Sequence, residues 1–255
     1  MQNTVRCPNL TDLPHPPADK SGWPWTEETP LPADGSIATW PSIGIVTPSF
    51  NQGAFIEQTI RSVLLQQYPK LQYVIIDGGS TDETLKVIKK YEPWIDHWVS
   101  EPDRGQSHAI NKGFQRCGGD VVNWLNSDDM LNAGALQSVG RTFAQSPETD
   151  VVVGRCWYEY LFDPAASHLD EPAPTLERLE LMPVVTTLTQ PSCFYRRRLL
   201  DREPPLDESL HYKMDYDLWC YFHDKGANWK LIDDVLSVFQ FSGDNKSLTG
   251  GRKAI

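Results

Sequence analysis

Residues 121–129 read Val-Val-Asn-Trp-Leu-Asn-Ser-Asp-Asp, a largely apolar run that ends in two adjacent carboxylates. The run predicts a buried strand over residues 121–125. Burying two neighbouring carboxylates without a cation is prohibitively costly, and carboxylate oxygens are ligands that Mg²⁺ and Mn²⁺ prefer. We therefore expect a divalent-cation site at the end of a central strand. An exposed acidic turn that caps the following helix is the competing interpretation.

The sequence on both sides of this run alternates between strand and helix patterns. Short runs rich in Val, Ile, Tyr and Trp predict further strands at residues 43–47, 73–76, 97–99, 151–153, 229–232 and 235–241. Helical patterns are found at about residues 56–64, 85–91, 107–117, 136–143 and 215–224. Repeated βα units with apolar strands predict an α/β fold with a Rossmann-like, mostly parallel central sheet flanked by helices. A smaller mixed region is expected toward the C-terminus.

Composition divides the chain into an arm and one domain. Residues 1–40 hold many prolines together with Trp23 and Trp25. Proline at this density predicts an extended arm, and the two indoles predict that the arm is pinned against the domain. Residues 41–135 and 136–255 are interpreted as two halves of a single domain.

The charge balance excludes several classes of partner. The 34 acidic and 23 basic residues give a net charge of −11, which disfavours binding to nucleic acid. Five widely spaced cysteines without a Cys-x-x-Cys pair predict neither a zinc site nor a redox site. No stretch approaches 18 consecutive apolar residues, so no transmembrane segment is expected. These features predict a cytoplasmic protein, and peripheral association with the inner face of a membrane stays compatible with them.

Three more polar clusters follow predicted strands, where open parallel sheets bind their ligands. The first, Thr-Pro-Ser-Phe-Asn, covers residues 47–51, and its turn is expected to leave Thr47 free at the strand end. The second, Asp-Gly-Gly-Ser-Thr-Asp, covers residues 77–82. Asp77 is expected to accept hydrogen bonds from a base or ribose, and the adjacent glycines allow close approach of a ligand to the backbone.

The third cluster, Glu-Pro-Asp-Arg-Gly-Gln, covers residues 101–106 and places Arg104 beside a glycine, which suits contact with an anionic or planar group. Each cluster also has a purely structural interpretation. The first fits a plain βα turn, the second fits a helix N-terminus that uses Asp82 and Glu83, and the third fits a structural Asp103–Arg104 loop.

The ordered series of these clusters, followed by Asp-Tyr-Asp-Leu-Trp at residues 215–219, resembles the family 2 glycosyltransferases, which are inverting enzymes of the GT-A fold. The resemblance covers roughly residues 41–248. It implies a donor-binding half at residues 41–135 and an acceptor-binding half at residues 136–255. Any single motif is weak, whereas the ordered set is highly specific.

The resemblance also implies roles for matching positions. Asp129 would bind the metal ion, Mn²⁺ or Mg²⁺, and Asp215 would be the catalytic base. The expected nucleotide-sugar contacts are Thr47, Pro48, Ser49, Asn51, Asp77, Gly79, Arg104 and Asp128. Gln190 is expected on the acceptor side, together with Asp217, for which a structural role is the alternative because it lies some 200° around the helix from Asp215.

Two positions depart from the family pattern. Met214 stands where the family usually has an acidic residue, and Ser242 stands where many relatives carry a histidine that helps with the metal or diphosphate. These departures put in doubt the motif around the base and a further metal ligand supplied by the protein.

The sequence therefore predicts a metal-dependent inverting glycosyltransferase that uses a nucleotide-diphosphate sugar, with a UDP-sugar as the expected donor. A glycan, a lipid-linked sugar or a protein is the expected acceptor. A catalytically silent nucleotide-sugar-binding module stays open as an alternative. A sugar nucleotidyltransferase would normally carry a glycine-rich, basic loop after the first strand, which residues 48–51 lack. A glycosidase would leave the clusters at Asp77 and Asp128 unexplained.

Overall fold

The computed structural model describes residues 8–31, 39–170 and 188–242. Within these ranges the strands are β1 Ile43–Ser49, β2 Leu71–Asp77, β3 His97–Ser100, β4 Val121–Trp124, β5 Met130–Leu131, β6 Val151–Tyr160, β7 His168–Leu169, β8 Cys193–Arg196 and β9 Trp229–Phe241. The α-helices are α1 Ile56–Leu64, α2 Thr84–Tyr91, α3 Gln106–Arg116, α4 Ala135–Gln145 and α6 Met214–Asp224.

The described strands form one nine-stranded sheet with the order β3-β2-β1-β4-β8-β6-β9-β5, and β7 pairs with β6. Strands β3, β2, β1 and β4 run parallel to one another. β8 then runs antiparallel to both β4 and β6, which marks the change from the parallel part to the mixed part. The fold is α/β with a mostly parallel sheet, as the sequence predicted.

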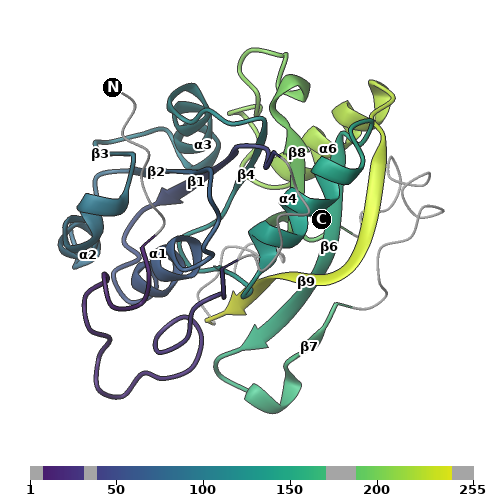
Figure 1. The fold of residues 1–255 in the computed structure, drawn as a ribbon. Coiled ribbons are helices and arrows are strands. Elements are labelled where there is room, and N and C mark those ends of the chain that lie inside the picture. The colour runs from purple at the N-terminus through teal and green to yellow at the C-terminus, as the bar shows by residue number, and fades with distance from the viewer. Residues whose placement is uncertain (1–7, 32–38, 171–187, 243–255) are drawn as a thin grey trace.

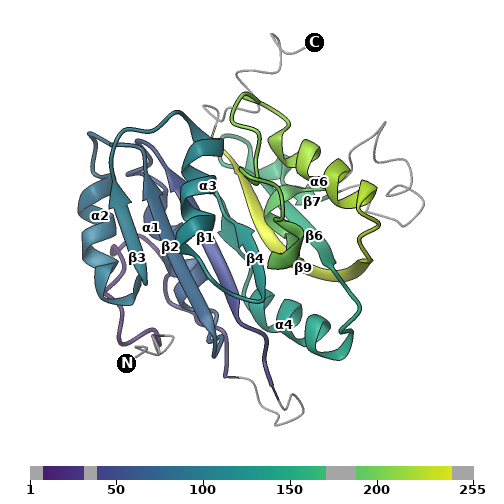
Figure 2. The same ribbon diagram turned by 90° about the horizontal axis from the view of Figure 1, so that it is seen from above.

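Helices cover both faces of the sheet (Figures 1 and 2). Apolar side chains of α1, α2 and α4 pack in one buried cluster with alternate residues of the strands, such as Ile45 and Tyr73. Side chains of α3 and α6 pack in a second cluster on the opposite face, with Val46 and Trp124. Strands β1, β2 and β4 therefore contribute buried residues to both cores, which explains why their sequences are largely apolar.

Two strands differ from the sequence-based expectation. β6 extends over Val151–Tyr160 instead of three residues, and β9 is one strand over Trp229–Phe241 instead of two. The strands pair in parallel along most of their length, with register shifts around Arg155. Asp233 and Asp234 of β9 stay exposed at these shifts. A bulge lets the ladder continue past polar residues that otherwise suggest a break.

The N-terminal arm is pinned by its tryptophans, as expected. Trp25 is buried, and the Trp23 indole donates a hydrogen bond to the Leu131 carbonyl oxygen at 2.9 Å. The buried Arg61 guanidinium of α1 donates to the carbonyl oxygens of Pro24 and Trp25 at 3.0 and 2.9 Å. The division of the domain at residue 135 stays a prediction.

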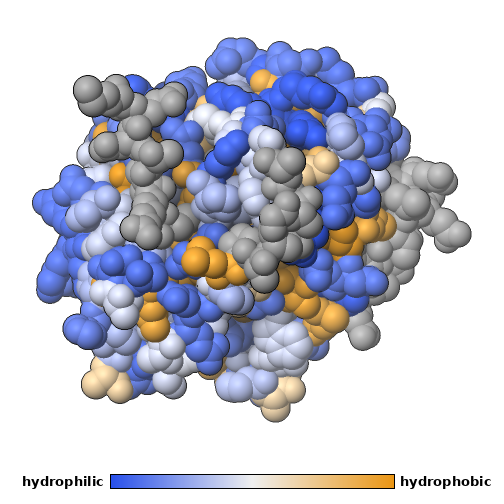
Figure 3. Space-filling model, viewed as in Figure 1, coloured by the Kyte–Doolittle hydropathy of each residue, from blue (hydrophilic) through white to orange (hydrophobic). Residues whose placement is uncertain are grey.

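The molecular surface is mixed in character. The face drawn in Figure 3 is mostly hydrophilic, and its larger apolar patches lie around the centre and lower right. Exposed apolar side chains at the end of β6 include Trp157, Leu161 and Phe162. Among the described helices, none is long and apolar enough to cross a membrane. The expected cytoplasmic location stays a prediction.

Contact between α3 and β1 leaves no space for a side chain at Gly113. A Cβ atom there would lie 2.2 Å from Cγ1 of Val46, whose β-branched side chain is buried and stiff. We expect Gly113→Ala to lower the free energy of unfolding by about 1–3 kcal/mol through overpacking, although alanine favours helix over glycine. Urea denaturation measures this change. Arg116→Ala on the same helix is the exposed control, and equal stability of Gly113→Ala and wild type would contradict the packing described.

Candidate active site

The parallel register of β1 to β4 brings all four predicted polar clusters to one edge of the sheet, with residues 126–129 after β4 as the fourth cluster. Ser49 of β1 is the Cα partner of Asp77 in β2, and Asp77 is in turn the partner of Ser100 in β3. Trp124, which ends β4, is the partner of Val46, so the chain after it continues to the same edge. The ends of four strands therefore place their following loops side by side.

The carboxyl group of Asp77 organises the loops at this edge. Its side chain is fully buried, and Oδ2 accepts hydrogen bonds from the backbone N–H groups of Gly79 and Ser80 at 3.1 and 2.8 Å. Oδ2 also accepts from the Ser100 hydroxyl at 2.6 Å, and Oδ1 accepts from the Ser80 hydroxyl at 2.5 Å. Asp77 therefore has a structural role in this loop, independent of any ligand. Its contact with a nucleotide stays a prediction.

The loops after β1 and β2 hold each other. The Asn51 backbone N–H donates to the Ser80 hydroxyl at 2.7 Å, and the Thr81 N–H donates to Asn51 Oδ1 at 2.9 Å. Asn51 has a φ of 53°, a left-handed conformation that asparagine tolerates better than most residues. Helix α2 begins at Thr84 with Glu83 as its N-cap residue, and the Thr84 backbone N–H donates to Asp82 Oδ1 at 3.0 Å, so the Asp82 side chain satisfies a free amide at the helix start.

The third cluster, residues 101–106, contacts both the second cluster, residues 77–82, and the fourth, residues 126–129. A Cβ atom on Gly78 would lie 2.8 Å from Asp103 Oδ2, so the second and third clusters pack closely. The Gln106 side-chain amide donates to Asn126 Oδ1 at 2.8 Å, which ties the start of α3 to the loop after β4. Arg104 is exposed and forms an ion pair with Glu208 at 2.5 Å.

The two adjacent carboxylates of the fourth cluster lie in different environments. Asp129 is buried, and its carboxyl oxygens accept from the Gln240 backbone N–H and the Asn126 side-chain amide, both at 3.2 Å. Burial raises the pKa of the Asp129 carboxyl well above its ordinary value, the neighbouring Asp128 adds to the rise, and these two hydrogen bonds oppose it. Asp128 is only partly buried. The pair therefore presents Asp128 more openly than Asp129.

Oxygen donors in this loop fit a hard divalent cation. Within the described ranges, no group of three or more His, Cys, Asp or Glu side chains is arranged to hold a metal ion. Oxygens of Asn126 and Asp128 would therefore leave most coordination positions to other ligands, as Mg²⁺ sites shared with phosphates do. The donor set suits a cation that binds together with a diphosphate.

The residues of the first cluster are more deeply buried than the sequence predicts. Thr47 does not lie free at the strand end, because it is buried within β1 and its hydroxyl is 3.1 Å from the Tyr73 hydroxyl. Pro48 is also buried. Ser49 is buried as well, and its hydroxyl makes no hydrogen bond within the described structure. The alternation of side chains along a strand that continues to Ser49 explains why Thr47 turns into the core.

Phe50, to which the sequence patterns assign no role, is 59% exposed directly after β1. An aromatic ring with this exposure offers a flat surface beside the predicted base-binding cluster. The sequence signal for such a role is an aromatic residue within an otherwise polar turn.

Gln190 lies just before β8 and contacts the end of β4. Its side chain is buried, and its amide nitrogen donates to the Trp124 carbonyl oxygen at 2.8 Å and to Asn123 Oδ1 at 3.1 Å. Its Oε1 has no hydrogen-bond partner within the described structure. A buried acceptor without a partner is unfavourable, so a donor group from a ligand or water fits this position.

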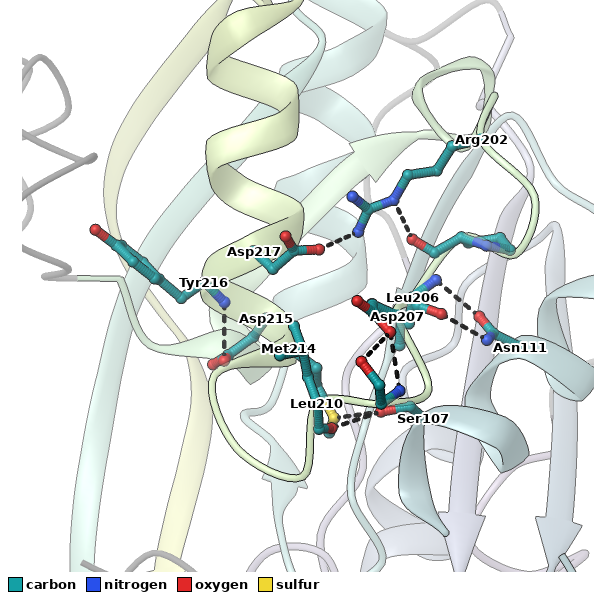
Figure 4. Close-up of polar contacts among 12 residues, drawn as sticks. Ser107, Asn111, Arg202, Leu206, Asp207, Leu210, Met214, Asp215, Tyr216 and Asp217 are labelled. Carbon is teal, nitrogen blue, oxygen red and sulfur yellow. Dashed lines mark hydrogen bonds and ion pairs between the residues drawn. The ribbon is translucent and has the colours of Figure 1, made fainter. Parts of the chain in front are cut away.

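Asp215 and Asp217 point to different sides of the first turn of α6 (Figure 4). Asp215 is partly buried, and its carboxyl accepts from the Tyr216 backbone N–H at 2.9 Å. Asp217 forms an ion pair with Arg202 on the other side. This arrangement agrees with the structural interpretation of Asp217, and the acceptor-side alternative stays a prediction.

Comparisons with known proteins agree with this architecture. The family model described as "Glycosyl transferase family 2" matches residues 44–203. The chain is 38% identical over 106 residues to the putative teichuronic acid biosynthesis glycosyltransferase TuaG of Bacillus subtilis, covering 40% of this chain and 42% of the relative. It is 31% identical over 118 residues to the poly(ribitol-phosphate) β-N-acetylglucosaminyltransferase TarP of Staphylococcus aureus, covering 44% and 36%. The matched segments therefore span less than half of either relative.

Solved structures share the fold. Residues 1–349 of S. aureus TarS superpose with a TM-score of 0.63 at 20% identity, covering 78% of this chain and 60% of TarS 1–349. TarS has also been solved in complex with UDP-GlcNAc, with a TM-score of 0.61, 17% identity and coverage of 82% and 60%. The mannosyltransferase PcManGT from Pyrobaculum calidifontis, solved with GDP-Man and Mn²⁺, has a TM-score of 0.59 at 17% identity, with coverage of 89% and 64%. These neighbours show that the fold is GT-A.

The hydrogen bonds of Asp77 lead to a stability prediction. In Asp77→Asn an amide N–H₂ group would replace one acceptor and face the donors of Gly79 or Ser80. We expect the free energy of unfolding to fall by about 2–4 kcal/mol, because buried hydrogen bonds to a charged group are lost and donors stay unpaired. Urea denaturation measures the fall, and hydrogen exchange measures faster opening of the two amides.

Asp120→Asn is the control for this substitution. Asp120 accepts hydrogen bonds from the backbone and hydroxyl of Ser42 near the opposite end of β1. Loss of the Asp120 carboxylate should leave the hydrogen-exchange rates of the Gly79 and Ser80 backbone amides unchanged. Unaltered exchange in Asp77→Asn would show that this carboxyl group does not organise the loop.

Proposed function

The chain belongs to glycosyl transferase family 2, and from this membership we propose that it moves a sugar from a nucleotide-diphosphate donor to an acceptor hydroxyl by a single inverting displacement. The observation that carries the proposal is the contact among four polar clusters at the carboxyl ends of β1 to β4. Asn51 joins the first cluster to the second, and the Gln106–Asn126 hydrogen bond joins the third to the fourth.

A nucleotide sugar fits this edge because open α/β sheets bind nucleotides outside their strand ends. Phe50 offers an aromatic surface for a base, and the Ser49 hydroxyl is a buried group that a ligand can satisfy. We propose a UDP-sugar as the donor, in keeping with the UDP-GlcNAc complex of TarS. Arg104 would exchange its ion pair with Glu208 for the donor.

We assign the divalent cation, Mn²⁺ or Mg²⁺, to Asp128. Sequence reasoning assigned it to Asp129, but the buried Asp129 carboxyl already binds Asn126 and the Gln240 backbone, whereas Asp128 is more exposed. Asp128 would hold the cation there, and the cation would supply positive charge to offset the charge of the departing nucleoside diphosphate. Asp129 then serves to hold the loop after β4 against β9.

Asp128→Asn tests the assignment of the cation. We expect the Mn²⁺ concentration that half-saturates the UDP-dependent rise in melting temperature to increase at least about tenfold, the effect that loss of even a ligand's partner produces. Thermal-shift titration of UDP with Mn²⁺ measures it without turnover. Asp129→Asn is the matched control and should change the melting temperature of the free protein more than the Mn²⁺ requirement. The reverse pattern would return the cation to Asp129.

We propose that Asp215 is the base that removes the proton of the acceptor hydroxyl. An acceptor hydroxyl becomes a better nucleophile when a positioned carboxylate removes its proton as the bond to the anomeric carbon forms. Asp215 lies at the start of α6, partly buried, whereas Asp217 is occupied by Arg202. Single displacement needs no covalent sugar intermediate, so the site requires no further nucleophile.

Asp215→Asn separates catalysis from binding. We expect kcat for sugar transfer to fall at least about a hundredfold, since general-base catalysis contributes about 10²–10⁴-fold, while the Kd for UDP stays within about twofold of wild type. Asp217→Asn on the same helical turn is the control and should retain most of the turnover. Full activity of Asp215→Asn would refute the base assignment, and absence of donor turnover in the wild-type protein would favour a silent binding module.

We propose a polysaccharide or related glycan polymer as the acceptor, in keeping with the names of TuaG and TarP. Gln190 supports an acceptor position near the end of β4, because its free Oε1 can accept a hydrogen bond from a sugar hydroxyl. Tyr158 of β6 contacts the residue before Gln190, with its hydroxyl 2.8 Å from the Thr189 hydroxyl. Tyr158 also makes ring contacts with Phe239 and Phe241, and aromatic surfaces of this kind suit the apolar faces of sugars.

A further inference from the structure

Helix α3 supports the segment that leads into α6. This segment, residues 206–213, contains turns and bends but no helix or strand. Lys213, at its end, has a φ of 60°, so the chain enters α6 through a left-handed residue without glycine. Among the described residues, no strand ladder includes the first turn of α6, which carries Asp215. Its position therefore depends on side-chain contacts.

Asn111 holds the start of this segment (Figure 4). It is 2% exposed, and its Nδ2 donates to the Leu206 carbonyl oxygen at 2.9 Å and to Glu208 Oε1 at 3.1 Å. Its Oδ1 accepts from the Leu206 backbone N–H at 2.9 Å. The amide thus mimics a strand partner for Leu206 and also holds the Glu208 side chain.

Ser107, one helical turn before Asn111, contacts the other end of the segment. Its hydroxyl lies 2.8 Å from Sδ of the buried Met214 and 3.4 Å from the Leu210 carbonyl oxygen. Met214 immediately precedes Asp215. Residues four apart share one face of a helix, so Asn111 and Ser107 hold both ends of the segment from a single rigid element.

The same helix is tied to the donor side. Gln106 at its start binds Asn126, and Arg104 just before it pairs with Glu208, which Asn111 also holds. α3 therefore connects the loops proposed to bind the donor to the segment that carries Asp215.

We propose that Asn111, assisted by Ser107, is a positioning residue that sets the place of Asp215 relative to the bound donor. This inference rests on the proposed function, because it takes Asp215 as the base. Because Asn111 is 2% exposed and its amide binds Leu206 and Glu208, we assign its effect to the Leu206–Met214 segment and not to contact with donor or acceptor. This arrangement also explains why a methionine suits position 214, where the family usually has an acidic residue. The Met214 thioether is buried against the Ser107 hydroxyl.

Loss of the Asn111 amide should lower catalysis without weakening donor binding. We expect Asn111→Ala to lower kcat about tenfold to a hundredfold, the loss that a misplacement of about 1 Å produces. The Kd for UDP with Mn²⁺ should stay within about twofold of wild type. Ser107→Ala should produce a smaller fall in the same direction.

The experiment compares four variants of the full chain by kcat, by the Kd for UDP with Mn²⁺ and by hydrogen exchange of residues 206–218. Asn111→Leu is close to asparagine in size and removes both hydrogen-bonding groups without placing a charge beside Glu208, so it serves if Asn111→Ala does not fold; Ser107→Ala is the milder variant. Gln137→Ala is the matched control. Gln137 is a buried amide on α4, and it donates to the carbonyl oxygens of Pro30 and Gln66 on the opposite face of the sheet.

A fall in kcat with faster exchange at residues 206–218, absent from Gln137→Ala, supports the proposal. A kcat equal to that of Gln137→Ala, or a rise in the Kd for UDP that accounts for the whole loss, overturns it. Measuring Asp215→Asn beside these variants distinguishes failure of this inference from failure of the proposed base. If Asp215→Asn is inactive and the Asn111 variants are fully active, only this inference fails. If Asp215→Asn is fully active, the assignment of the base fails.

Discussion

The buried carboxyl group of Asp77 is the constraint on which the donor side of the molecule depends. It accepts hydrogen bonds from the Gly79 and Ser80 backbone and from the Ser80 and Ser100 hydroxyls, so it fixes the ends of β2 and β3 together. Asn51 then attaches the end of β1 to the same loop through its contacts with Ser80 and Thr81. A buried carboxyl group is tolerated only when its oxygens are satisfied, and satisfying them determines the shape of this edge.

A second set of contacts joins the mixed part of the sheet to this edge. The Gln240 backbone of β9 binds Asp129, and Gln190 binds the Trp124 carbonyl oxygen where β4 ends. The antiparallel strand β8 makes this possible, because it brings the chain that follows Gln190 beside β4. The proposed donor and acceptor sides therefore meet within one continuous sheet, with Asn126 to Asp129 between them.

Environment separates side chains that are chemically identical. Asp128 and Asp129 are neighbours, yet one is partly exposed and the other is buried with a raised pKa. Asp215 and Asp217 lie two residues apart, yet only Asp217 forms an ion pair with Arg202. The helical period directs the second pair to different sides, and the packing of β9 against the loop distinguishes the first pair. These differences underlie the proposed division between cation binding, proton transfer and structural support.

The sequence by itself determined the fold class and which loops form the candidate site. Apolar periodicity located β1 to β4 and α3, and polar residues after those strands located the loops, because both signals are local in the chain. Orientation and partnership were decided only by the tertiary structure. Thr47 turned into the core because β1 continues to Ser49, and Asp77 acquired partners from β3 as well as from its own loop. The role of Asn111 depends on Leu206 and Glu208, 95 and 97 residues away in the chain, and no local pattern records contacts made across such distances.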